Sequence, residues 1–146
     1  MAVQELLICA SGGPTRRDEV VRNPAWSEVE AAVRALDNAT RNDVYLRLCE
    51  SIDDTWLSVA GGAGRYLVTG VDGGARFPTR ARGDGSAEGM VSLVVGGQPG
   101  EYPALHIVDL DAALRAARAF LLAGSFSGGI EWEWTGRTKM RLAFEL

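Results

Sequence analysis

The single histidine, His106, is the residue best suited to acid–base chemistry in this chain of 146 residues. A Ser/His/Asp triad or a Cys/His dyad would have to include it, with the nucleophile on a turn that exposes it to substrate. Neither Cys9 nor Cys49 lies in such a turn, the two cysteines lack the CxxC spacing of a zinc site, and one histidine is too few for a His-based zinc site. His106 stands in the apolar run 105–108, which indicates a structural role.

The glycine-rich segment 61–65 (Gly-Gly-Ala-Gly-Arg) is the one place that suggests a phosphate-binding loop. A P-loop carries Lys-Ser/Thr and opens onto a helix, whereas this segment lacks that pair and precedes a strand-like run. We interpret it as a hairpin turn in which glycine supplies positive φ. With no phosphate loop and few soft metal ligands, we expect no cofactor and no metal.

Carboxylates gather in two places: Glu50, Asp53 and Asp54 in a predicted turn, and Glu131 and Glu133 on a predicted strand. Paired carboxylates perform acid–base chemistry only when they are buried together in a cleft. Aspartate is common in turns for local backbone reasons, and the two glutamates alternate with tryptophans, so we expect all five to face water. An acidic docking surface is the sharper alternative.

Trp132 and Trp134 share one side of the predicted strand 130–134. Such a pair usually anchors a core, because each ring can bury ~150–250 Å². An exposed pair would instead be an interface hot spot. We expect the core role for both rings, and no catalytic set emerges from these residues.

The elements that position these residues follow from periodicity. Alternating apolar residues predict strands at 4–9, 44–49, 56–60, 65–69, 90–95, 105–108, 130–134 and 139–146. Helical spacing predicts a first helix over 24–37, begun by Asn23-Pro24 or by Ser27, and a second from its Asp109 cap to Gly124.

Three segments are expected to be loops. The charged segment 15–22 and the Pro/Gly segment 99–103 read as surface loops, and 72–89 as a loop with a short edge strand near Phe77. Strands joined by hairpin turns predict an α+β domain, a mainly antiparallel sheet with two helices on one face, over the single domain 1–146.

Charge is unevenly distributed along the chain. The net charge is −4, and residues 1–73 hold 11 acidic against 7 basic side chains. This sign argues against direct nucleic-acid binding. The first residues lack the basic start of a signal peptide, and no apolar run is long enough for a membrane span. We therefore expect a cytoplasmic protein with reduced thiols and no membrane partner.

Several motifs, in order, resemble immunity protein family one of bacterial polymorphic toxin systems. They are Asn23-Pro24-x-Trp26, Trp56-Leu57-Ser58-Val59 running into Gly61-Gly62-x-Gly64-Arg65-Tyr66, Gly96-Gly97, and Trp132-x-Trp134. The resemblance covers about residues 20–135. It implies a small α+β protein that binds and neutralises a secreted toxin, often a nucleic-acid deaminase, in the producing cell. It brings no catalytic residues, and it makes Trp26, Trp56, Trp132 and Trp134 structural core residues.

The charge distribution then suggests where a toxin would bind. A toxin that grips a nucleic-acid backbone is basic around its groove, so an acidic inhibitor can occupy the same surface. We place the interface of a one-to-one complex on Glu50, Asp53, Asp54 and Asp72. Two alternatives remain: a regulatory interaction module with a non-toxin partner, and an enzyme that pairs His106 with Asp109 or Asp111.

Overall fold

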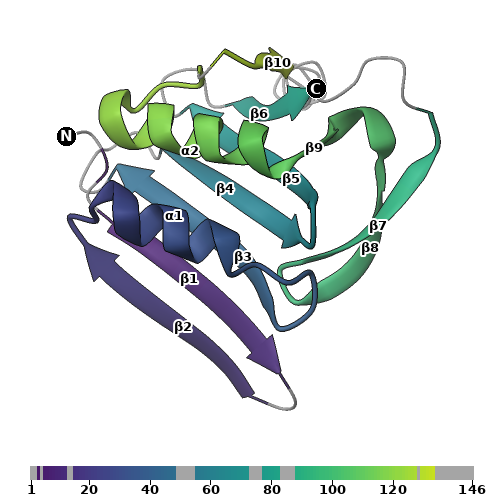
Figure 1. The fold of residues 1–146 in the computed structure, drawn as a ribbon, viewed down its shortest axis with the longest axis horizontal. Helices are drawn as coiled ribbons and strands as arrows, with labels where there is room; N and C mark the ends of the chain where they lie inside the picture. The colour runs from purple at the N-terminus through teal and green to yellow at the C-terminus, as the bar shows by residue number, and fades with distance from the viewer. Residues whose placement is uncertain are drawn as a thin grey trace, which may run out of the picture.

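The chain folds around one large sheet, with both helices in front of it in Figure 1. The computed structural model describes residues 3, 5–12, 15–48, 55–72, 77–82, 88–127 and 129–133. They include the helices α1 (Trp26–Arg34) and α2 (Leu110–Ala123) and the 3₁₀ turn η1 (Ala104–His106). The strands are β1 (Glu5–Gly12), β2 (Thr15–Arg22), β3 (Arg41–Leu48), β4 (Thr55–Gly62), β5 (Arg65–Asp72), β6 (Phe77–Arg82), β7 (Met90–Val95), β8 (Gln98–Pro103), β9 (Ile107–Val108) and β10 (Glu131–Glu133).

Eight strands make the main sheet, in the order β10-β6-β5-β4-β3-β1-β2 with β9 beside β5. The hairpin of β7 and β8 is a second, two-stranded sheet. All these pairs are antiparallel. Both helices cover the same face of the main sheet (Figure 1). The predicted class, an α+β fold with a mainly antiparallel sheet and two helices on one face, is confirmed.

The core lies between this face and the helices. Leu6, Leu46 and Leu57 are cross-strand neighbours on β1, β3 and β4, and none is more than 1% exposed. Because alternate residues of a strand point to one face, these leucines form a row beneath the helices. Phe120 of α2, fully buried, packs into the same cluster. Burying such side chains stabilises each by about 1.5–3 kcal/mol relative to exposure.

The predicted meander is confirmed, including its glycine turn. β3, β4 and β5 pair in sequence, and β4 meets β5 across the two-residue loop Ala63-Gly64. Both loop residues have positive φ, +56° and +90°, as the right-handed twist of a two-residue hairpin requires. Segment 61–64 is therefore the hairpin turn that the sequence predicts.

Helix α1 begins two residues away from either predicted start, midway between them. Its N-cap is Ala25, and the Glu28 carboxylate accepts a hydrogen bond from the Ala25 N–H at 2.9 Å. Neither Asn23 nor Ser27 is the cap, because Glu28 rather than a cap side chain satisfies the exposed donor. The helix ends at Arg34, three residues before the predicted end.

Helix α2 has the predicted ends but a different buried stripe. Asp109 Oδ1 accepts the Ala112 N–H at 2.9 Å, and Gly124 closes the helix at φ +67°. The helical spacing predicts a buried stripe of Leu110, Leu114, Ala117 and Leu121; Ala117 and Leu121 are buried as predicted, whereas Leu110 and Leu114 are only half-buried. The completely buried positions are mainly small residues, Ala113, Ala116, Ala117 and Phe120. Small side chains let α2 approach the sheet closely.

Two predicted loops are strands. Segment 15–22 is β2, paired along its length with β1, and 99–103 belongs to β8, paired with β7. Both lie at the margin of a sheet, where charged residues and prolines are tolerated because one side of the strand pairs with no other described strand.

The remaining predictions hold in part. The strand near Phe77 exists as β6, but it lies between β5 and β10 rather than at the edge. Of 105–108, only Ile107 and Val108 form a strand, because the 3₁₀ turn takes the preceding residues. The predicted strand 139–146 lies outside the described residues.

Candidate partner-binding site

The predicted acidic interface falls mostly outside the described residues. Glu50, Asp53 and Asp54 are not described, and of Asp72 only the backbone, at the end of β5, is described. The flanking residues show where this region leaves the sheet. Leu48 pairs with Thr55, so the segment between them begins and returns at one end of the sheet. Because β3 and β5 run in the same direction, Asp72 lies at that same end.

That end of the sheet also holds a small charge network. Glu5 of β1 lies 3.7 Å from Arg22 and 3.6 Å from Arg47, its cross-strand neighbours on β2 and β3. These pairs align the margins of three strands, and being exposed they contribute little free energy, about 0–1 kcal/mol each. The end of the sheet is therefore of mixed charge, and the predicted acidic interface stays a prediction.

Of the four tryptophans, three lie in the described residues, and each is half-buried. Trp132 packs on the core edge-on to Phe126, with ring centroids 5.2 Å apart, and its indole N–H donates to the Ser127 carbonyl at 3.2 Å. Trp26 packs on the same cluster beneath the Arg118 guanidinium, 5.7 Å from the ring centroid.

Trp56 occupies a different place. Its neighbour Leu57 points at the helices, so Trp56 faces the opposite side of the sheet, edge-on to Tyr45 at 5.7 Å. It is therefore not a member of the cluster under the helices, unlike Trp26 and Trp132. Trp134 lies outside the described residues.

His106 is buried against the C-terminal strand rather than paired with a nearby aspartate. Its Nε2 lies 3.1 Å from Glu133 Oε2, and it is 8% exposed. Alternation predicts that Glu133 faces water, but the turn η1 brings His106 beside it. Asp109 caps α2, and Asp111 accepts from Arg115 Nε at 2.9 Å. The contacts of both aspartates are thus with α2 and not with His106, so they do not support the enzyme alternative.

The two glycines before the hairpin turn form a close contact that the sequence did not predict. A Cβ on Gly62 would lie 2.5 Å from the Leu36 carbonyl carbon, so only glycine lets β4 approach the connection after α1 this closely. The Asn38 N–H donates to the Gly61 carbonyl at 2.9 Å. The connection between α1 and β3 is thus fixed to the end of β4.

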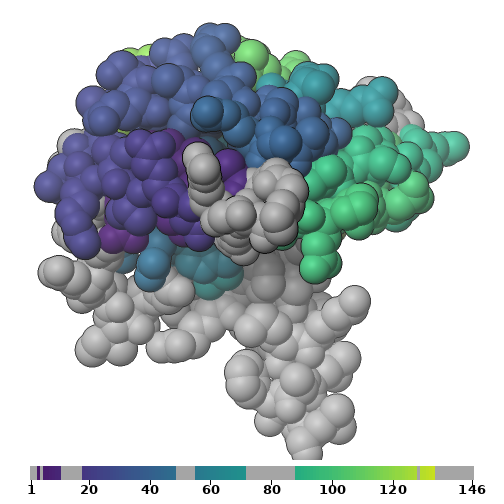
Figure 2. All heavy atoms as spheres, turned by 90° about the horizontal axis from the view of Figure 1, so that it is seen from below, coloured from purple at the N-terminus to yellow at the C-terminus, as the bar shows by residue number. Residues whose placement is uncertain are grey.

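The connection between α1 and β3, together with β3 itself, fixes the position of the β7–β8 hairpin. Asn38 Oδ1 accepts the Val94 N–H at 2.8 Å, and Asp43 Oδ1 accepts the Gly96 N–H at 2.7 Å. Leu93 is 1% exposed and fixes one face of the hairpin to the body. The other face is open, with Met90 56% exposed, and in Figure 2 the hairpin (green) projects to one side. A signal for it existed: Gly96-Gly97 between two extended runs is a two-residue hairpin loop.

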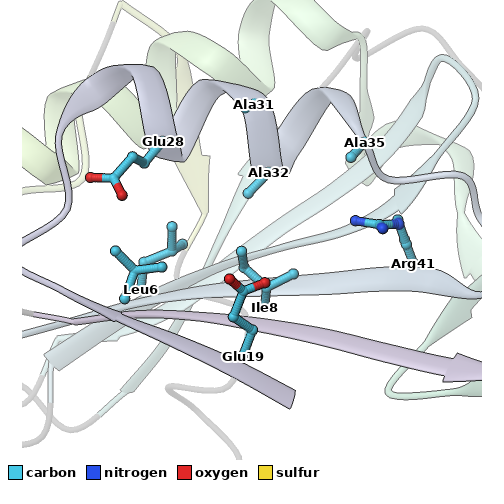
Figure 3. A pocket seen from close by; sticks show the side chains of 9 residues that line it. Leu6, Ile8, Glu19, Glu28, Ala31, Ala32, Ala35 and Arg41 are labelled. Atoms are coloured by element: carbon cyan, nitrogen blue, oxygen red, sulfur yellow. The ribbon is translucent and has the colours of Figure 1, made fainter. Parts of the chain in front are cut away.

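A second open feature lies between α1 and the β1–β2 hairpin. Here the structure has a hollow of about 380 Å³, shown in Figure 3. Its apolar lining consists of Leu6, Ile8, Val21, Ala31, Ala32 and Ala35. Three charged side chains complete it: Glu19, Glu28 and Arg41. We call it the α1–β2 groove.

Together the described residues form an α+β sheet with a projecting hairpin and an open groove. Among the described residues, no three or more His, Cys, Asp or Glu are grouped so that they could hold a metal ion. Neither described helix has the length and apolar character needed to cross a membrane.

The sequence matches the family described as immunity protein Imm1 over residues 17–134. The match covers most of the chain, and the protein therefore belongs to this immunity protein family, as its motifs predict. It begins within β2 and ends just after β10. No curated protein matches the chain, and no solved structure does.

Proposed function

We propose that this protein binds a cognate secreted toxin in the producing cell and neutralises it by covering its active site. The observation that carries this proposal is membership of the Imm1 immunity family across nearly all described elements. The toxin class that we infer is a nucleic-acid deaminase. The acidic excess of residues 1–73 supports that class, since a nucleic-acid enzyme is basic around its substrate groove.

On this proposal the chain does no chemistry itself. The residues of the enzyme alternative have structural contacts: His106 with Glu133, Asp109 with the start of α2, and Asp111 with Arg115. Inhibition then depends on affinity alone. Protection at low cellular concentration calls for a Kd of nanomolar or below, about −12 kcal/mol or better. Such affinity goes with a buried interface of roughly 1,600 Å² or more.

The test uses the toxin domain encoded beside this gene, expressed with and without this protein. We expect cell killing by the toxin alone, survival with both, and a one-to-one complex by light scattering. In vitro, deamination of DNA or RNA should fall in proportion to added inhibitor and reach zero at equal concentrations. A neighbouring product that is harmless, or that kills despite excess inhibitor, would contradict immunity. Inhibition with deamination of a free nucleoside intact would place the contact outside the active site.

A further inference from the structure

The α1–β2 groove lies along the free margin of the main sheet. β2 is the last strand of the sheet order, and no described strand pairs with its outer side. The groove opens between this strand and α1, as Figure 3 shows. Leu6 at its base is fully buried, whereas Ala31 and Ala35 on the wall are exposed. An apolar side chain entering from outside β2 would therefore meet apolar atoms on both sides.

The register of the sheet shows which backbone groups are available at this margin. Ile8 pairs with Glu19, and Leu6 with Val21. Hydrogen-bonded pairs alternate along antiparallel strands, and the Gly62–Arg65 pair beside its two-residue loop sets the alternation for the sheet. When this alternation is followed strand by strand from β5 to β2, the backbone N–H and C=O groups of Asp18, Val20 and Arg22 point away from β1. The groups of Val20 and Arg22 can pair with one more strand.

The side chains at the groove specify the charge of that strand. Glu28 is held at one end by the Ala25 N–H, and Arg41 lies at the other end (Figure 3). Within the described residues, the Glu19 carboxylate and the Arg41 guanidinium form no ion pair and no side-chain hydrogen bond. Glu19 lies between these two ends, beside Ile8, and a cationic side chain would be its matching neighbour (Figure 3).

We propose that the α1–β2 groove and the outer edge of β2 receive an extended segment of the toxin by strand addition. This rests on the proposed function and names the surface that performs it. The segment pairs its backbone with Val20 and Arg22. It places an aliphatic side chain in the groove and a Lys or Arg against Glu19. Backbone pairing supplies affinity in such recognition, and the alternate side chains supply specificity. The charged side chains of β2 also disfavour pairing with strands of other proteins that carry no complementary charge.

The test measures binding of the neighbour-encoded toxin domain to four variants of the full chain. Val20→Pro removes one outward N–H without touching the pairs to β1, and Val20→Ala controls for the lost side chain. Glu19→Arg reverses the groove charge, and Glu88→Arg makes the same change at an exposed acid before β7. We expect Kd to rise at least tenfold for Val20→Pro and Glu19→Arg and less than threefold for the two controls. Melting temperatures should stay within a few degrees of wild type.

Hydrogen exchange gives a second readout. In the wild-type complex, the amides of Val20 and Arg22 should become protected at least tenfold. If Val20→Pro and Glu19→Arg fold and bind as wild type, and these amides stay unprotected, the groove is not the contact although immunity stands. If the wild type neither binds nor protects cells, the proposed function itself fails. If the free protein is a dimer that Val20→Pro dissociates, the occupant is a second copy and the proposal is overturned.

Discussion

Gly62 illustrates how single residues fix the geometry of this protein. Its φ of +133° and the backbone of Leu36 and Asn38 beside it exclude any side chain. Gly64, two residues later, also has positive φ, +90°, but a Cβ at this position would meet no other atom within 4 Å. One glycine therefore serves a close approach between segments, and the other serves only the turn.

We predict that Gly62→Ala lowers the free energy of unfolding by at least about 2 kcal/mol, because backbone strain adds to a backbone clash. Gly64→Ala, which meets only the strain, should cost about 1 kcal/mol. Urea unfolding of both variants checks this. Equal costs would show that the contact with Leu36 does not constrain β4.

Trp132 allows a second prediction at this scale. Its ring packs on Phe126 and its N–H bonds to Ser127, although the side chain is only half-buried. We expect Trp132→Ala to cost about 3 kcal/mol, the low end for large aromatic truncations. Trp132→Phe, which keeps a ring and loses the hydrogen bond, should cost about 1 kcal/mol. Thermal melts measure both. Lost toxin binding at unchanged stability would make Trp132 a contact residue instead.

At the scale of elements, patterning predicts the strands that have one apolar face. β3, β4, β5 and β7 all follow from alternation, since burial of one face forces period two. β2 is not predicted as a strand because both of its faces carry charged residues, so its sequence shows no alternation of apolar residues. β8 is not predicted as a strand because it contains Pro99 and Pro103. The register with β7 places both prolines where the backbone nitrogen points away from β7, so no N–H is needed for pairing.

The groove could not be predicted for a different reason. Leu6 lies in a predicted strand and Ala32 in a predicted helix, whereas Val21 lies in the segment predicted as a surface loop. Their meeting depends on how far α1 lies from β2, which is set by packing between segments and not by local sequence. His106 is similar, because its neighbour Glu133 is 27 residues away and reaches it only through the sheet order.

The connection between α1 and β3 carries a pH-dependent prediction. Partial burial opposes ionisation of Asp37, but hydrogen bonds from the Arg41 N–H, the Thr40 hydroxyl and the Ala39 N–H outweigh it and hold the pKa of Asp37 below its ordinary 3.8. Because the folded-state pKa is the lower one, the ionised carboxylate stabilises the fold above about pH 4. This stabilisation is lost as pH falls through the folded-state pKa.

We therefore predict that Asp37→Asn is less stable than wild type at pH 7, and that the difference shrinks below about pH 4. Thr40→Val, which removes one of the three donors, should reduce the pH-dependent part without abolishing it. Urea unfolding followed at neutral and acidic pH measures the difference. A gap between wild type and Asp37→Asn that stays constant over this range would show that Asp37 does not act through its charge.

For the whole molecule, charge and topology point to one end of the main sheet. Arg41 begins β3 beside Ala10, at one end of the groove, and β3 ends at Leu48, next to the Arg47–Glu5 pair at the other end of β1. The undescribed acids Glu50, Asp53 and Asp54 follow Leu48 in sequence. Because these acids follow Leu48 in the chain, we expect them to attract a basic toxin surface toward this end of the sheet. Long-range attraction of this kind raises the association rate more than it changes dissociation.

The last prediction follows from that steering. We expect the association rate constant with the toxin to fall at least about tenfold from 0.05 to 0.5 M salt, since screening at ~0.15 M leaves a range of only about 8 Å. Asp53→Asn/Asp54→Asn should lower the association rate at low salt and leave dissociation nearly unchanged. The matched control is Glu88→Gln/Glu101→Gln, which removes two exposed charges outside the acidic half of the chain and should associate as wild type. Surface plasmon resonance at several salt concentrations separates the rates. A rate independent of salt, with full protection of cells by Asp53→Asn/Asp54→Asn, would show that the toxin is captured by the apolar groove and strand edge without electrostatic steering.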